Sequence, residues 1–135
     1  MVYSLALLIL LPITGLAQKH INKEVVYQLA YSDTLTSIGV SNLTEVRLRD
    51  NTRCDIVTDT FAIEVDFADK WAEAIGQSLH YSIMLDKKPA ILLILEDPKN
   101  SRYLDRLMVT ATKYGVKVWV VDSNFNIKFV VNKVK

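Results

Sequence analysis

The sequence predicts an α/β protein with a mixed central sheet flanked by helices. Two patterns carry this prediction. Short segments between residues 44 and 65 alternate polar and apolar residues, which is typical of antiparallel strands joined by tight turns. Further along, apolar strand-like runs alternate with amphipathic helical segments, which implies right-handed parallel crossovers. The 135 residues, half of them apolar, suffice for one domain with one packed core.

Residues 1–17 differ from the rest of the chain. The run SLALLILLPITGLA is almost wholly apolar, is short for a transmembrane helix, and ends in Gly15-Leu16-Ala17, where signal peptidase reads small residues. We interpret it as a secretory signal peptide cleaved after Ala17. One domain over residues 18–135 would then be periplasmic or secreted, without membrane attachment. No Lys or Arg precedes the apolar run, so an uncleaved N-terminal membrane anchor stays open as the alternative.

The first half of the chain predicts one helix and three strands. Apolar residues at helical spacing predict an amphipathic helix over residues 21–30, and the Ser, Thr, Gly and Asn residues that follow indicate a loop or an irregular helix end. The expected core face of this helix is Ile21, Val25, Val26, Leu29 and Ala30. Three strands are expected over 44–49, 53–57 and 62–65, and Asp50-Asn51 predicts a tight turn between the first two.

The second half predicts alternating helices and strands. A clear helix is expected over 69–85, and the continuous apolar run 90–96 predicts a central strand covered on both faces. A helix capped by Asn100 or Ser101 should run to residue 114, with Gly115 at its C′ position. A further strand follows over 116–121, and 127–131 is expected to add an edge strand. The core order is therefore αβββαβ.

Three carboxylates gather on the second and third predicted strands. Glu64 and Asp66 are two residues apart and so point to the same face. If Val57 pairs with Ala62 across the turn, Asp55 lies opposite Glu64, with Cβ atoms roughly 4.5–5.5 Å apart. Carboxylates this close repel unless a cation lies between them, and Mg²⁺ typically takes one or two carboxylates plus water and phosphate oxygens. We therefore predict a site for Mg²⁺ or Mn²⁺ with Asp55 and Glu64 as ligands.

Two residues beside these acids, Arg53 and Cys54, are also explained by ordinary structural roles. The same register places Arg53 opposite Asp66, so an ordinary cross-strand ion pair stays open as an alternative role for Asp66. Cys54, the single cysteine, cannot form an internal disulfide. Inside a predicted strand it is expected to be a core residue.

The helix predicted over 69–85 carries a polar face beside the acids. Lys70, Gln77 and Tyr81 are spaced by seven and four residues, which keeps them on one side of a helix. A polar face toward a site and an apolar face toward the core is a coherent arrangement.

At these residues the chain resembles the PD-(D/E)XK nuclease superfamily, over about residues 44–95. Asp55 matches the Asp and Glu64 the acidic residue that bind Mg²⁺ in that superfamily. Gln77 and Tyr81, in Q-S-L-H-Y, are similar to the Q-x-x-x-Y signature of its RecB-like branch. The resemblance implies a restriction-endonuclease-like fold.

The resemblance breaks at one position. The superfamily has a Lys two residues after the Glu, which helps to activate or orient water, and here that position is Asp66. Lys70 on the next helix could supply the missing charge. Alternatively, Asp66 could be a third ligand, with the metal alone activating water. Glu45 on the first strand could add a further ligand.

Two functions follow from the resemblance, and whether the chain is an enzyme stays open between them. The first is an exported, Mg²⁺-dependent nuclease that hydrolyses phosphodiester bonds. Its catalytic residues would be Asp55, Glu64, Asp66 and Lys70, and its substrate-binding residues Gln77 and Tyr81. The alternative is a catalytically degenerate protein that kept the fold and acts as a binding or interaction module. The formal charge of +1 gives no overall basic field, so contact with nucleic acid would be local.

Overall fold

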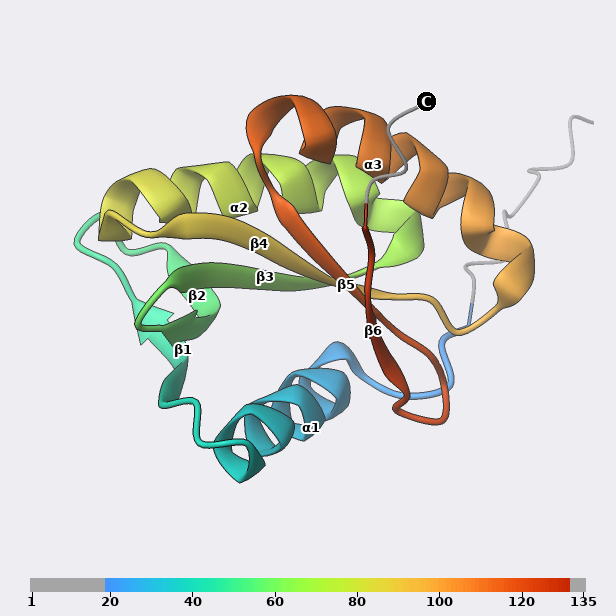
Figure 1. Cartoon of the computed structure of the whole chain (residues 1–135), viewed down its shortest axis with the longest axis horizontal. Helices are drawn as coiled ribbons and strands as arrows, with labels where there is room; N and C mark the ends of the chain where they lie inside the picture. Colours follow the sequence, from blue (N-terminus) through green and yellow to red (C-terminus); the bar gives the residue numbers. More distant parts are fainter. Residues whose placement is uncertain (1–18, 132–135) are drawn as a thin grey trace, which may run out of the picture.

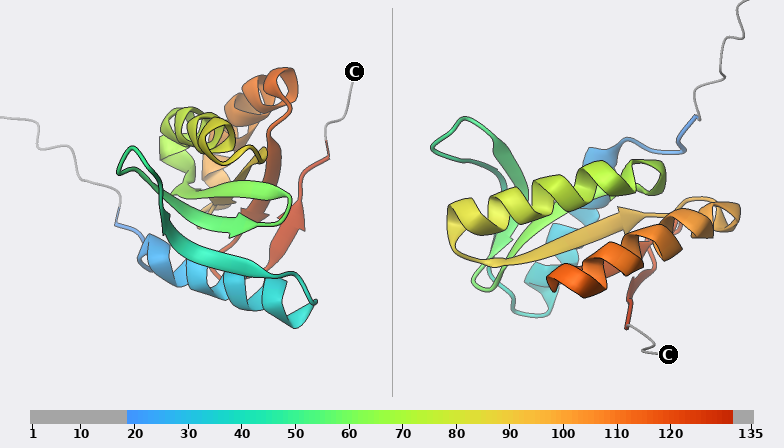
Figure 2. Two further views of the ribbon diagram at one scale, coloured as in Figure 1. Left: turned by 90° about the vertical axis from the view of Figure 1, so that its left-hand side faces the viewer. Right: turned by 90° about the horizontal axis from the view of Figure 1, so that it is seen from above.

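A computed structural model describes residues 19–131 as one six-stranded sheet with helices on both faces (Figure 1). The helices are α1 (Glu24–Ser37), α2 (Trp71–Leu85) and α3 (Ser101–Tyr114), with short 3₁₀ turns at Ala68–Lys70 and Pro98–Asn100. The strands are β1 (Asn42–Arg47), β2 (Arg53–Thr58), β3 (Phe61–Phe67), β4 (Lys88–Ile94), β5 (Lys117–Val121) and β6 (Ile127–Phe129). Helices α2 and α3 cover one face, and α1 lies on the other (Figure 2).

The predicted fold class is confirmed. The strands lie in the sheet in sequence order, β1 to β6. Strands β1, β2 and β3 form an antiparallel meander, β3, β4 and β5 run parallel, and β6 returns antiparallel to β5. Short turns permit only antiparallel neighbours, whereas the helical crossovers α2 and α3 permit parallel ones. The αβββαβ order is thus present, extended by α3, β5 and β6.

The signal peptide predicted for residues 1–17 lies outside the residues that the structure describes. Within residues 19–131, no helix is both long enough and apolar enough to cross a bilayer.

Helix α1 differs from its prediction in length and in orientation. It continues to Ser37, because hydroxyls such as that of Thr34 bond the carbonyl one turn back and so tolerate the helix. The predicted core face was wrong, since residues such as Val25 and Leu29 are exposed. The buried side chains of α1 are Tyr27, Gln28, Tyr31 and Leu35. Two large aromatic rings thus replace the aliphatic stripe as the contact with the sheet.

The core is divided by the sheet. On the α1 side, Tyr27 and Tyr31 pack with the odd-numbered residues of β3 and with β4. On the other side, α2 and α3 pack over β4 and β5. Strand β4 is buried on both faces, as its apolar run predicts. The even-numbered residues of β3, which include Glu64 and Asp66, therefore face the α2 side.

Candidate metal centre

The candidate site lies where β2 and β3 separate. The two strands pair at Val57–Ala62 and Ile56–Ile63, as predicted, and the ladder stops there. One residue further, the main-chain N–H of Val65 donates to Oδ2 of Asp55 at 2.8 Å. A side chain thus replaces the next backbone partner, which leaves the Asp55 carboxylate between the strands.

Three acids are buried at this point. The exposed fractions of Asp55, Glu64 and Asp66 are 8%, 5% and 3%. Burial is the largest cause that raises the pKa of each carboxyl, to about 6 for Asp55 and to about 10 for Glu64. For Glu64 the charges of Asp55 and Asp66 add to that effect. Removing carboxylates from water and placing them together makes their charged forms costly without a compensating cation.

A fourth acid, Glu24, joins them from the first turn of α1. Its pKa is raised to about 7, first by burial and then by the charges of Asp66 and Asp55, while Lys70 opposes them. Glu24 was not predicted as a site residue, because nothing in the local pattern connects the start of α1 with β2 and β3. A lone acid in the first turn of a helix ordinarily stabilises the helix dipole.

The structure assigns the predicted ion pairs differently. Nζ of Lys70 lies 3.7 Å from Oδ1 of Asp66, whereas Nε of Arg53 lies 2.7 Å from Oε2 of Glu45. The cross-strand pair between Arg53 and Asp66 was therefore wrong. Glu45 has a positive φ of 57°, and its other oxygen accepts from the amide of Gln28 at 2.8 Å. Both carboxylate oxygens of Glu45 are therefore bonded to Arg53 and Gln28, although the residue lies beside the buried acids.

The predicted polar face of α2 is partly assembled. The Gln77 amide donates to the Tyr81 hydroxyl at 3.2 Å. Burial raises the pKa of Tyr81, and the charges of Glu64 and Asp55 add to this, which places its ring near the acids. His80, by contrast, turns away and bonds Asp50 at 2.7 Å. Cys54 is fully buried beside Tyr81, and burial raises its thiol pKa to about 12, which agrees with a core role.

One observation indicates that these carboxylates could hold a divalent cation. Oε2 of Glu64 is buried and has no hydrogen-bond partner among the described residues. Buried polar atoms are nearly always paired, so an orphaned carboxylate oxygen beside other acids is what a hard cation would satisfy. As the side chains lie, no three His, Cys, Asp or Glu residues within 19–131 form a ready cluster for one ion. Two protein carboxylates suffice for Mg²⁺, which keeps several waters.

A carboxylate outside this cluster, that of Glu96, fixes the segment that precedes α1. It follows β4 and accepts from the N–H groups of Ile21 and Asn22 at 3.0 and 3.2 Å, and from the hydroxyl of Tyr27 at 2.7 Å. Nδ1 of His20 lies 3.2 Å away. Burial acts to raise the pKa of Glu96, but these hydrogen bonds outweigh it and lower the pKa. These contacts flank Glu24, so Glu96 holds the segment that leads into that acid.

Replacing Glu96 with Ala is expected to weaken Mn²⁺ binding about tenfold without unfolding the protein, since partners beyond the ligands typically contribute 10–100-fold. Calorimetric titration would measure it. Glu24→Gln should lose a similar factor, and the double variant little more, because both act through one position. Asp122→Ala is the control, since Asp122 also accepts main-chain N–H groups but lies in the β5–β6 turn. Full affinity in a folded Glu96→Ala protein would contradict the positioning role.

Comparisons with known protein families and with curated proteins find no match to the chain. Among solved structures, the chain is similar to one described as a "CdiA-CT/CdiI toxin and immunity complex from Burkholderia pseudomallei". The identity is 15%, the TM-score is 0.46, and the match covers 89% of this chain and 93% of that one.

Proposed function

We propose that the protein is a divalent-metal-dependent nuclease of the PD-(D/E)XK kind, with Asp55 and Glu64 as the metal ligands. The observation that carries the proposal is the buried, unpartnered oxygen of Glu64 among other buried acids. Among the described residues no donor satisfies that oxygen, and its neighbour, the Asp55 carboxyl, can share a hydrogen bond with Glu64 only when one of the two is protonated. An apolar side chain would be more stable there, so the acid has a function other than folding.

Mg²⁺ or Mn²⁺ is the proposed cofactor, because oxygen ligands of this kind suit hard cations. When bound, such an ion polarises a phosphoryl oxygen and lowers the pKa of its water. Asp55 is fixed for this task by the N–H of Val65, which holds its carboxylate between the strands. Glu24 and Asp66 add negative charge at the same point and so strengthen the attraction for a cation.

Lys70 supplies the positive charge that the motif otherwise lacks. The charge of Asp66 is the largest cause that raises the pKa of Lys70, so its ammonium stays protonated at neutral pH. A protonated Lys cannot take a proton from water, but it can orient water and stabilise the charge that develops on a phosphate. The ion pair with Asp66 keeps that ammonium toward the acids. Gln77 and Tyr81 are proposed to contact the substrate backbone.

The proposed substrate is a nucleic acid, and the proposed location is outside the cytoplasm, with residues 1–17 acting as a cleaved signal peptide. Because the net charge is only +1, binding would depend on local contacts around Lys70 rather than on an overall field. Weak attraction of this kind predicts cleavage that falls with rising salt.

Calorimetric titration with Mn²⁺ tests the metal site directly, on the chain from Gln18 onward. Wild type is expected to bind about one ion, and Asp55→Ala is expected to lose binding, because Asp55 is fixed as a ligand. Asp59→Ala is the matched control, since Asp59 is exposed on the β2–β3 turn.

Assays on labelled DNA and RNA, with and without Mn²⁺, complete the test. Cleavage by wild type that disappears in Asp55→Ala would support the nuclease. Binding of Mn²⁺ without cleavage would favour the non-catalytic binding module instead. Equal Mn²⁺ binding by wild type and Asp55→Ala would contradict the proposed site.

A further inference from the structure

A cavity lies between the sheet and the C-terminal half of α1. Its volume is about 690 Å³, within the range of roughly 300–1,000 Å³ that is usual for small-molecule sites. Its walls come from the end of α1, the loop after it, the β2–β3 turn, β3, β5 and β6. Asp59 is the only charged residue in its lining, and that side chain is exposed at the rim. The interior is therefore uncharged.

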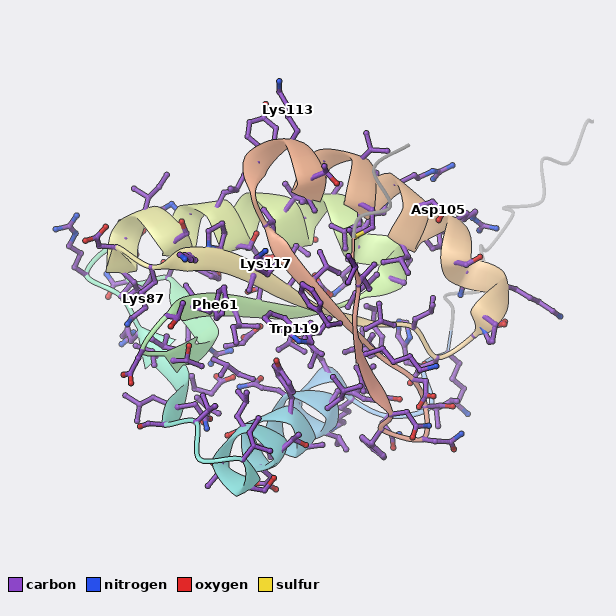
Figure 3. All side chains as sticks on the ribbon, in the orientation of Figure 1. Phe61, Lys87, Asp105, Lys113, Lys117 and Trp119 are labelled. Atoms are coloured by element: carbon purple, nitrogen blue, oxygen red, sulfur yellow. The ribbon has the colours of Figure 1, made fainter. Side chains whose placement is uncertain are left out.

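Aromatic rings form the floor of the cavity. The Trp119 ring on β5 lies 5.6 Å from that of Phe61, 6.1 Å from that of Tyr31 and 5.4 Å from that of Phe129, centroid to centroid. Figure 3 shows Phe61 and Trp119 on the side of the sheet that faces α1. The planes of these rings are tilted or nearly perpendicular to one another, which is a geometry that aromatic pairs prefer. A further aromatic ring would pack against them in the same way.

The Tyr31 hydroxyl lies in the cavity without a protein partner among the described residues. Tyr31 is 4% exposed, and its hydroxyl makes no hydrogen bond to any described residue, although it lines the cavity. The other two tyrosines that the structure buries are both partnered, Tyr27 with Glu96 and Tyr81 with Gln77. The hydroxyl oxygen itself is not fully buried, so it opens on the cavity, where it is available for a ligand that brings an acceptor.

The cavity is separate from the acidic site. Tyr31 lies seven residues beyond Glu24 on α1, which corresponds to roughly 10 Å along the helix. The remaining α1 residues of the lining, Thr34, Leu35 and Ile38, lie further along still. A ligand in the cavity would therefore leave the acids accessible, and this inference does not depend on the proposed nuclease.

We propose that this cavity binds a small, planar, uncharged aromatic molecule that carries a hydrogen-bond acceptor. The ring would stack in the aromatic floor around Trp119, and the acceptor would take the hydrogen of the Tyr31 hydroxyl. An acyl chain would fill the volume but leave that hydroxyl unpaired. An anion would meet an uncharged interior and the rim carboxylate of Asp59, which excludes charged ligands of that sign.

Quinoline and naphthalene form the matched pair of probes, because they share size and shape and only quinoline has an acceptor nitrogen. The indole N–H signals of the protein in NMR spectra report binding, and with only two tryptophans, Trp71 serves as an internal control for Trp119. Quinoline is expected to shift the Trp119 signal and to bind about fivefold more tightly than naphthalene, as one hydrogen bond would give. Tyr31→Phe should remove that difference, and Tyr114→Phe, at an exposed tyrosine, should not.

A second variant tests the proposal by filling the cavity with a side chain. Thr34→Phe adds a ring at an exposed helical position in the lining and should abolish the shift while the protein stays folded. The proposal is overturned if quinoline leaves Trp119 unchanged, or if Tyr31→Phe retains the preference for quinoline. It is also overturned if decanoic acid displaces quinoline with higher affinity. Dimerisation that Thr34→Phe abolishes would assign the cavity to a second copy instead.

Discussion

Glu64→Gln is expected to remove most of the metal-dependent cleavage and, at the same time, to make the metal-free protein more stable at neutral pH. The folded state disfavours the charged form of Glu64, because burial and then the charges of Asp55 and Asp66 raise its pKa to about 10. A raised pKa contributes stability below the unfolded value of about 4.5, and that contribution is lost as the pH rises toward the folded value. Gln carries no charge at any pH and avoids the loss.

The raised pKa values of the other acids determine how the stability of the metal-free protein depends on pH. The pKa of Asp55 is raised from 3.8 to about 6, and that of Glu24 from 4.5 to about 7. Metal-free wild type should therefore lose stability steadily from about pH 4 to pH 8. Glu64→Gln should be more stable than wild type at pH 8 by on the order of 2–4 kcal/mol and show a flatter profile. Mn²⁺ should stabilise wild type at pH 8 but not the variant.

Urea unfolding at pH 5 and pH 8, with EDTA or with Mn²⁺, measures these effects. Asp105→Asn on α3 is the control, since that side chain is exposed and far along the chain from the acids (Figure 3). Cleavage by Glu64→Gln should fall about 10²–10³-fold, the loss typical of removing a major stabiliser of the transition state. Unchanged cleavage, or a variant less stable than wild type at pH 8, would contradict the proposed metal site.

Much of the fold could be predicted because it depends on local patterns. The alternation in β2 and β3, with a short turn between them, determines that Val57 pairs with Ala62. That register brings Asp55 next to Glu64, so two residues of the candidate site could be proposed from the sequence. The αβββαβ order follows similarly from lengths and periods, and Gly115 ends α3 at a φ of 68° as its position predicts.

The rest depends on contacts between distant segments. Glu24 reaches the acids only because α1 crosses the sheet in one orientation, which Glu96 and the two tyrosines fix. Residues such as Val25 gave α1 an apolar stripe, but burying two aromatic rings removes more apolar surface from water. The Arg53–Asp66 pair failed for a related reason, because the β2–β3 ladder stops before reaching them.

Lys70→Met is expected to lower the turnover number about 10²-fold while leaving Mn²⁺ affinity unchanged or slightly higher. The ammonium lies 3.7 Å from Oδ1 of Asp66 and also opposes the raised pKa of Glu24, whereas Arg53, which acts on Asp55, is paired with Glu45. Removing the ammonium makes the site more negative, which favours a metal ion, but it takes away the charge that would stabilise the reacting phosphate. Lys113→Met is the control, since Lys113 is exposed near the end of α3 and points away from the sheet (Figure 3).

The pairing with Asp66 allows a sharper distinction between catalysis and structure. If Lys70 serves only to neutralise Asp66, then adding Asp66→Asn to Lys70→Met should restore both the stability and the turnover of the protein. If Lys70 acts on the substrate, the double variant should regain stability but not turnover. Lys70→Arg should keep part of the rate, because it retains the charge in a different geometry. Full turnover in Lys70→Met would show that an acid at the motif's lysine position needs no replacement cation.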